Sequence, residues 1–316
     1  SSLTLKTLRE ISYFASVSLS SSSLLQVEQA RKIVEHLARQ PQATYGVNTG
    51  FGALATKRIP ISEFEQLQLN LIRSHSVGVG PLLSVAETRA LMTLRLNVLL
   101  KGYSGCRALI CQLLADMLNH NIHPLVPSQG SVGASGDLAP LSHIALALIG
   151  EGQVEYRSQV IPAKDALAEA RLTRCKLQAK EGLALINGTQ AMTAVGGLAA
   201  EQALTLAKHA NRIAAMTLEA KRGITDAFDE SIHLARPHPG QILSASEINE
   251  YIQGSKLVTS SSNSTRVLDA YSLRCTPQVH GASIDALTYA EQVLVRESNA
   301  VTDNPLVITA DQRLIS

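Results

Sequence analysis

The feature that most constrains the fold of this chain is a long, alanine-rich stretch with helical spacing at residues 181–221. A helix of that length would span about 60 Å, which is longer than a small domain is wide. Such a helix normally runs through a bundle or across a subunit interface. Polar residues inside the stretch, among them Asn187, Gln190, Glu201 and Lys208, exclude a span through lipid. The stretch therefore predicts a bundle of long helices.

Aromatic residues are scarce, because Trp is absent and only 4 Phe and 7 Tyr occur. The core must then consist of Leu, Ala, Ile and Val, which favours closely packed helices. Helical spacing recurs at residues 24–40, 61–73, 84–100, 107–119, 138–149, 224–235, 246–252 and 281–296, and a hairpin is expected at 153–161. We predict a mainly α protein with an N-terminal domain over residues 1–180 and a central long-helix bundle over residues 181–316.

Composition excludes several classes of function. A hydrophobic content of 45% and a charged content of 17% are typical of a folded chain. The net charge of +2 is too balanced to indicate a nucleic-acid or membrane partner. The four cysteines form no CxxC pair and no metal-ligand cluster, and no secretory leader pattern is present. We therefore expect a reduced, cytoplasmic protein.

A glycine-studded stretch at residues 130–143, Gly-Ser-Val-Gly-Ala-Ser-Gly-Asp-Leu-Ala-Pro-Leu-Ser-His, offers a tight turn followed by an acid and an apolar run. Its small residues, Ala134, Ser135 and Gly136, allow the backbone to fold onto itself. Asp137 stands where it would cap the following helix. Taken alone, the stretch is more typical of a capped loop-to-helix junction than of a catalytic site.

Two other patterns are weak indications of ligand binding. The glycines at 130, 133 and 136 and those at 46, 50 and 52 resemble phosphate-binding loops, but neither set has the spacing of a dinucleotide site or a P-loop. His120 and His123 lack acidic partners, so a zinc site is not expected and both are predicted to be surface or capping histidines. We expect neither a metal nor a nucleotide.

Five polar residues stand out because each lies among glycines or small residues: Tyr45, His75, Asn187, Tyr271 and Arg274. Each has a structural explanation on its own, as a packed tyrosine, a loop histidine, a hydrogen-bonded asparagine or a surface cation. Only their combination favours a site.

That combination resembles the aromatic amino-acid ammonia-lyase family, and within it the histidine-specific members. The likeness is carried in order by Tyr-Gly-Val-Asn-Thr-Gly-Phe-Gly at 45–52, the stretch at 130–143, Lys-Glu-Gly-Leu-Ala-Leu-Ile-Asn-Gly-Thr-Gln at 180–190, Tyr-Ser-Leu-Arg-Cys at 271–275 and Asp-Asn-Pro at 303–305. The resemblance implies a fumarase/aspartase-like helical fold and a homotetramer with sites shared between subunits.

The resemblance also implies a prosthetic group, 4-methylidene-imidazol-5-one (MIO), formed from Ala134, Ser135 and Gly136. The amide nitrogen of Gly136 would attack the carbonyl of Ala134, and Ser135 would lose its hydroxyl as water. The product is an electrophile, which no ordinary side chain supplies. Such a group would allow a chain without metal or nucleotide motifs to be a carbon–nitrogen lyase.

By the same resemblance, Tyr45 would be the base that removes the β-hydrogen and Arg274 would bind the substrate carboxylate through a bidentate contact. Asn187 and Tyr271 would orient the substrate and stabilise the MIO region. His75, in the pair Ser74-His75, would face the substrate ring. This pair favours elimination of ammonia from L-histidine to give trans-urocanate, a step in histidine catabolism.

Two departures from the family pattern keep alternatives open. Leu268 stands where the family usually has Gln, which leaves a phenylalanine or tyrosine ammonia-lyase or an aminomutase as a second interpretation. The resemblance also predicts a further C-terminal region after Ser316, so we expect the C-terminal part of the fold to be absent. A catalytically inactive fragment or assembly module is therefore a third interpretation.

Overall fold

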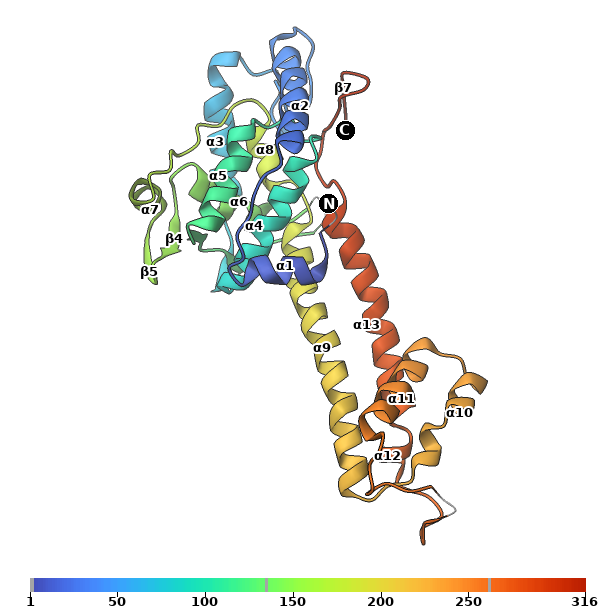
Figure 1. The fold of residues 1–316 in the computed structure, drawn as a ribbon. Helices are drawn as coiled ribbons and strands as arrows, with labels where there is room; N and C mark the ends of the chain where they lie inside the picture. The colour runs from blue at the N-terminus through green and yellow to red at the C-terminus, as the bar shows by residue number, and fades with distance from the viewer. Residues whose placement is uncertain (1–2, 134–135, 261–262) are drawn as a thin grey trace. The chain divides into compact units, whose positions relative to one another are not determined.

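The structure is a computed structural model that describes residues 3–133, 136–260 and 263–316 (Figure 1). The chain forms two compact units, residues 1–198 with 294–316 and residues 199–293. The two boundaries fall inside the long helices α9 (Gln190–Ala220) and α13 (Thr276–Asn299). These units have other bounds than the expected domains, and the division at residue 180 stays a prediction.

Helices dominate both units, as predicted. The first unit also contains α1 (Leu5–Ser12), α2 (Ser21–Arg39), α3 (Phe64–His75), α4 (Val85–Leu100), α5 (Ala108–Asn119), α6 (Leu138–Leu148), α7 (Ala163–Glu169) and α8 (Glu181–Ile186), with 3₁₀ turns at Gly52–Leu54 and Ile61–Glu63. The second unit also contains a 3₁₀ turn at Thr225–Phe228 and helices α10 (Glu230–Ala235), α11 (Pro239–Ile252) and α12 (Tyr271–Arg274).

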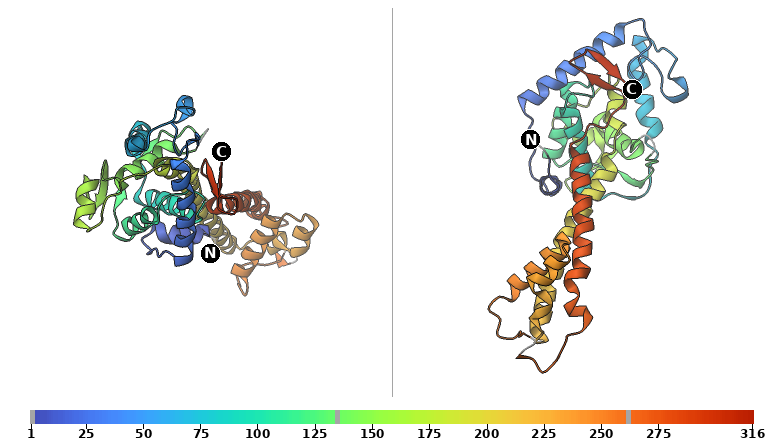
Figure 2. Two further views of the ribbon diagram at one scale, coloured as in Figure 1. Left: turned by 90° about the horizontal axis from the view of Figure 1, so that it is seen from above. Right: turned by 90° about the vertical axis from the view of Figure 1, so that its right-hand side faces the viewer.

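Short antiparallel strands accompany the helices of the first unit. They are β1 (Val79–Leu82) with β3 (Pro127–Gln129), β2 (His123–Pro124) with β4 (Gln153–Tyr156) and β5 (Gln159–Pro162), and β6 (Leu306–Ile308) with β7 (Arg313–Ile315). The predicted hairpin at 153–161 is confirmed as β4–β5. Its two-residue turn, Arg157-Ser158, has positive φ at both residues, as a tight hairpin requires. Figure 2 shows the β6–β7 hairpin beside α2.

Helix α4 lies at the centre of the first unit's core and contacts α1, α2 and α5 (Figure 1). It begins with a capping box, in which Ser84 accepts from the Glu87 amide and the Glu87 carboxylate accepts from the Ser84 amide. Apolar residues on all its faces are buried, including Leu91, Met92 and Leu99. A helix whose apolar residues are buried on all its faces belongs in the interior of a protein.

Two predicted helices have different bounds. Helix α11 begins at Pro239, well before the predicted start at residue 246, because proline is well suited to the first turn of a helix. The segment predicted as one helix at 224–235 is a 3₁₀ turn followed by α10. The two are separated at Asp229, whose side chain accepts from the amide of Ser231 at 2.9 Å and caps α10.

The long helix predicted at 181–221 is interrupted, which corrects the sequence interpretation. Helix α8 ends at Ile186 and α9 begins at Gln190, so Asn187, Gly188 and Thr189 leave the helix between them. Asn187 has an extended backbone, with φ −91° and ψ 103°. The break occurs at a predicted site residue. Residues distant in the sequence donate hydrogen bonds to the carbonyls that the end of α8 leaves without a partner in the helix.

The second unit has a small core of its own. Ala215 and Leu218 of α9 pack there against Phe228, Ile248 and Ile252. Across the part of the chain that the structure describes, no helix is long and apolar enough to cross a membrane.

His123 is buried, which corrects the expectation that it lies at the surface. Its side chain sits beside Arg89 of α4, with the His123 Nε2 and Arg89 Nη1 atoms 3.2 Å apart. Arg89 can only donate, so Nε2 accepts and the imidazole is neutral. Burial, and secondly the Arg89 charge, lowers the pKa of His123 from 6.5 to about 4.

The low pKa of His123 predicts a loss of stability in acid. Between pH 6.5 and 4 the unfolded chain binds a proton that the folded chain does not, so the free energy of unfolding falls as the pH falls through this window. We expect a loss of about 2–3 kcal/mol attributable to this group. Urea unfolding at several pH values should show it in the wild type and not in His123→Gln, and equal pH dependence of the two would contradict the assignment.

Candidate active site

The loop that contains Tyr45 is held by its neighbours in a fixed conformation. Gly46 has a φ of +72°, and a Cβ there would lie 2.9 Å from Leu183 Cδ2 and 3.0 Å from Pro305 Cδ. Asn48 supports the loop from within, because its Oδ1 accepts from the Thr44 amide at 2.7 Å. Tyr45 itself is half-buried. The loop therefore requires glycine next to the predicted base.

His75 is the last residue of α3 and is half-buried. Its Nδ1 lies 2.9 Å from the carbonyl oxygen of Leu71 and 3.1 Å from Ser74 Oγ. A carbonyl can only accept, so Nδ1 carries a proton and donates it. In the neutral ring, Nε2 is then an acceptor. This tautomer suits a residue that receives a hydrogen bond from a substrate.

The segment that follows His75 lies against the glycine-rich loop. Strands β1 and β3 pair Val79 with Gln129. A Cβ at Gly130, where φ is +144°, would lie 3.1 Å from the Cα of Gly78. The Gly78 amide in turn donates to His143 Nε2 at 3.2 Å, and burial lowers the pKa of His143, which keeps that nitrogen an acceptor. The two predicted site loops are thus joined in one unit.

Gly136 is the described residue of the predicted ring; Ala134 and Ser135 lie outside the residues that the structure describes. Gly136 has a φ of +101°, a region that favours glycine. A Cβ there would lie 2.7 Å from the carbonyl oxygen and 2.9 Å from the amide nitrogen of Gly188. Only glycine fits, because another backbone fills the space that a side chain would need.

Asp137 does not cap its own helix, which corrects the sequence interpretation. Its Oδ1 accepts from Ser131 Oγ at 2.6 Å, and its Oδ2 accepts from the Met192 amide at 2.9 Å, in the first turn of α9. The buried carboxylate therefore meets the positive end of a different helix. Its own amide donates to the Gly188 carbonyl at 2.6 Å. These contacts fasten the glycine-rich loop to the start of α9.

Asn187 connects the helix break to a second loop. Its Nδ2 donates to the Asn304 carbonyl at 3.3 Å. Pro305 is the residue that packs against Gly46. The turn at 302–305 therefore touches both the Tyr45 loop and Asn187, and the first unit brings these two predicted site segments together.

Buried charges surround this turn, and sequence reasoning missed them. Lys180 Nζ and Asp303 Oδ2 are 3.0 Å apart, and both side chains are fully buried. Arg95 of α4 is also fully buried and donates to the Asn187 carbonyl at 2.9 Å. Burial lowers the pKa of Arg95, and the charge of Asp303 opposes that shift. A charged residue inside the apolar run of residues 91–99 is the signal that could have identified Arg95.

Tyr271 and Arg274 lie in α12 of the second unit. The guanidinium carbon of Arg274 lies 4.3 Å from the centre of the Tyr271 ring, a cation–π contact. The Nε atom of Arg274 is buried and has no hydrogen-bond partner among the residues that the structure describes. Arg274, Leu268 and Asp269 line a cavity of about 240 Å³ within this unit. An unpaired guanidinium donor there could bind an anion.

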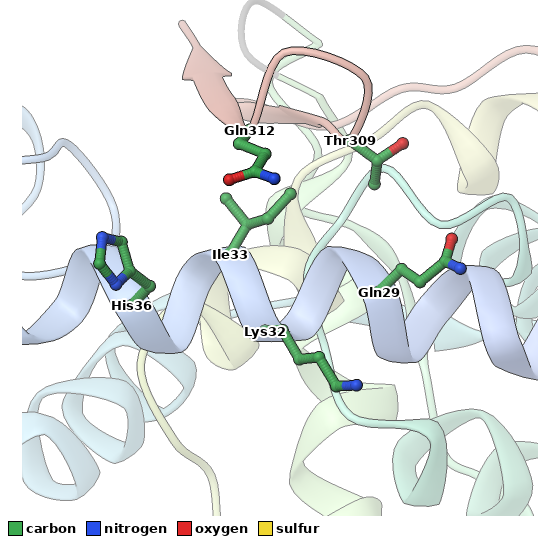
Figure 3. A pocket seen from close by; sticks show the side chains of 6 residues that line it. All are labelled: Gln29, Lys32, Ile33, His36, Thr309 and Gln312. Carbon is green, nitrogen blue, oxygen red and sulfur yellow. The ribbon is translucent and has the colours of Figure 1, made fainter.

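Another pocket of the first unit holds none of the predicted site residues. It has a volume of about 340 Å³, lies between α2 and the β6–β7 hairpin, and is lined by Gln29, Lys32, Ile33, His36, Thr309 and Gln312 (Figure 3). Within residues 3–133, 136–260 and 263–316, no group of three or more His, Cys, Asp and Glu residues is arranged to hold a metal ion.

Comparisons with known proteins agree with the family resemblance. A sequence model of the family described as "Aromatic amino acid lyase" matches residues 3–316. The chain is 49% identical over 315 residues to the histidine ammonia-lyase of Geobacillus sp. (strain WCH70), which covers 99% of this chain and 62% of that protein. The chain thus spans less than two thirds of the length of this curated relative.

Solved structures of the same kind have a similar fold. The tyrosine aminomutase from Streptomyces globisporus matches with a TM-score of 0.91 and 39% identity, over 97% of this chain and 62% of that one. The histidine ammonia-lyase from Trypanosoma cruzi matches with a TM-score of 0.90 and 37% identity, over 100% of this chain and 59% of that one.

The buried pair Lys180–Asp303 predicts a large effect of a small substitution. Asp303→Asn leaves the Lys180 ammonium buried without its counter-charge, so we expect the free energy of unfolding to fall by about 3–5 kcal/mol. The matched control is the exposed pair Arg157–Glu169, where Glu169→Gln should cost less than about 1 kcal/mol. Denaturant unfolding measures both, and similar losses at the two sites would contradict the structural assignment.

Proposed function

Because the chain belongs to the aromatic amino acid lyase family, we propose that the protein eliminates ammonia from L-histidine and releases trans-urocanate. The observation that carries the proposal is the contact of Gly136 with the Gly188 backbone, which leaves no room for a Cβ at Gly136, the last residue of the sequence Ala134-Ser135-Gly136. The choice of histidine rests on Ser74-His75 and on the 49% identity to the Geobacillus histidine ammonia-lyase.

The described residues fit the MIO group that the family implies. Ring closure brings the Gly136 amide nitrogen to the Ala134 carbonyl carbon, and a side chain at 136 would obstruct it. The positive φ of Gly136 and its packing against Gly188 satisfy this requirement. Once formed, the group supplies an electrophile that activates the amino acid for loss of its amine. The protein's remaining task is to bind the substrate and remove a proton.

Tyr45 is the proposed base. The substrate's β-hydrogen is weakly acidic, so the base must be held in place before the reaction. The Tyr45 loop meets this need through the Gly46 contacts with Leu183 and Pro305 and through the internal hydrogen bonds of Asn48. Asn187, whose side-chain amide is hydrogen-bonded to Asn304, is the proposed orienting group.

Arg274 is the proposed carboxylate-binding residue. A guanidinium binds a planar carboxylate through two parallel hydrogen bonds. Support comes from its unpaired, buried Nε, and from the Tyr271 ring that packs on the guanidinium and restricts its orientation. His75 is the proposed ring-binding residue, because its Nε2 can accept from the N–H of a substrate imidazole.

A second candidate is a phenylalanine or tyrosine lyase, or an aminomutase. Leu268 favours it, because this exposed apolar side chain lines the cavity beside Arg274 where the family usually carries Gln. The 39% identity to a tyrosine aminomutase also supports this reading. Relative rates with histidine, phenylalanine and tyrosine distinguish the two candidates.

We propose a homotetramer as the working assembly. Large apolar side chains are exposed along α9 at Leu206, Ile213 and Met216, and Val279 and Tyr289 are exposed on α13. The seven-residue spacing of Leu206 and Ile213 is typical of helices that pack against partner helices. The four cysteines are free thiols, which supports a cytoplasmic location.

Activity can be tested with the complete natural protein and L-histidine. We expect urocanate absorbance to rise and the intact mass to be lower by two water molecules. Tyr45→Phe should keep that mass loss and lower kcat by about 100-fold or more, because it removes the base alone. Ser135→Ala is the control that cannot form the exocyclic methylene. A wild type with the mass loss and no urocanate would contradict the histidine assignment.

The assembly has a separate test. Ile213→Glu places a charge on the exposed apolar face of α9, so we expect the tetramer to dissociate at micromolar concentration in light scattering after size-exclusion chromatography. Leu25→Glu changes an equally exposed leucine on α2 and should leave the mass of the assembly that of a tetramer. A wild type that elutes as a monomer would contradict the tetramer.

A further inference from the structure

Arg95 forms hydrogen bonds to several segments around the predicted site. It extends from the centre of α4 and is fully buried. Its Nη1 donates to the carbonyls of Asn187 and Thr302, at 2.9 and 3.2 Å, and to Gln190 Oε1 at 2.9 Å. Its Nη2 donates to the carbonyl of Ala184. One guanidinium therefore joins α8, the start of α9 and the turn at 302–305.

The decisive contact is with the peptide unit between Asn187 and Gly188. The oxygen of that unit accepts from Arg95, and its nitrogen is the Gly188 amide that lies 2.9 Å from the space where a Cβ of Gly136 would stand. The next carbonyl, that of Gly188, accepts from the Asp137 amide at 2.6 Å. By holding the plane of the Asn187–Gly188 peptide, Arg95 therefore also holds the Gly188 backbone atoms against which Gly136 packs.

A second set of contacts holds the guanidinium itself. Gln190 accepts from Arg95 through Oε1 and donates through Nε2 to Thr302 Oγ1 at 2.6 Å. Ala184 and Asn187 supply carbonyls from the C-terminal end of α8, where the helix dipole favours a cation. A side-chain Cβ at Gly188 would collide with Gln190 Oε1 and Arg95 Nη1. The arrangement therefore tolerates little displacement.

We propose that Arg95 is a positioning residue for formation of the prosthetic group, because it holds the Asn187–Gly188 peptide against Gly136, whose amide nitrogen is the nucleophile of ring closure. The inference rests on the proposed function. It assigns to a buried side chain of α4 a part in the maturation of the site, with no contact to substrate.

The step that Arg95 would support is balanced within the chain. A bond forms between the Gly136 nitrogen and the Ala134 carbonyl carbon. The Ala134 oxygen leaves as water with the amide hydrogens of Gly136 and Ser135, and a carbon–nitrogen double bond takes its place. The Ser135 hydroxyl then leaves with the hydrogen on Cα as a second water. No oxidant is needed, and holding the backbone in place is one contribution that neighbouring residues can make.

Lysine cannot replace arginine in this role. The planar guanidinium directs donors to several acceptors at once, whereas an ammonium is a compact charge at the end of a flexible stem. Arg95→Lys keeps the positive charge and loses the fork. We expect the cyclised fraction to fall at least about twofold, and kcat per total chain to fall in the same proportion while KM changes less.

Arg89→Lys in the complete protein is the matched control. Arg89 is buried in the same helix and also donates to backbone carbonyls, those of Ile11 and Leu118 at 3.0 and 2.8 Å, but it touches no predicted site residue. Both variants should lose thermal stability. The fraction of chains that have lost two waters, read from the intact mass, and the steady-state kinetics should change only in Arg95→Lys. Equal changes in the two variants, or wild-type values in a folded Arg95→Lys, would overturn the proposal.

Thr302→Val decides the matter if Arg95→Lys does not fold. It keeps the shape of the side chain and removes only the hydroxyl that accepts from Gln190. We expect a smaller loss of the cyclised fraction, and wild-type cyclisation and kcat would overturn the role of Arg95. A wild-type chain whose intact mass shows no loss of water contradicts the proposed function itself. The failure of the proposed function is thus distinguished from the failure of the Arg95 proposal.

Discussion

The contact of two glycine backbones, Gly136 against Gly188, is the constraint on which the candidate site depends. Neither position has room for a Cβ, since Gly136 faces the Gly188 peptide and Gly188 faces Gln190 and Arg95. The contact requires α8 to end at Ile186, because a continuous helix would not expose the Gly188 backbone. The interruption of the long helix is therefore a requirement of the site rather than a defect of the fold.

Ending a helix in the interior leaves carbonyls that need donors, and the buried charges of the first unit meet that need. Arg95 binds carbonyls at the end of α8. At the start of α8, the fully buried Glu181 accepts hydrogen bonds from Arg107 and from the Gln178 amide. Lys180 pairs with Asp303. A short helix inside an apolar core is thus held at both ends by charged side chains. Apolar side chains at the same positions would leave polar backbone atoms of the helix ends without hydrogen-bond partners.

The proposed chemistry divides between the two compact units. The first contains Tyr45, His75, Gly136 and Asn187, and the second contains Arg274 with Tyr271. Each unit holds its residues by local means. In the first, loops are locked by glycine packing and hydrogen bonds; in the second, a cation–π contact restrains the guanidinium.

Local patterns in the sequence were sufficient for the mainly α fold, the β4–β5 hairpin and the short ordered motifs that indicate the family. Helical spacing and turn residues act over a few neighbours, so one sequence reveals them. The helix break at Asn187, the capping of α9 by Asp137, the burial of His123 and the hydrogen bonds of Arg95 depended on partners distant in the chain. Only the tertiary structure decided these, because the cost of burying a polar group depends on which distant atom satisfies it.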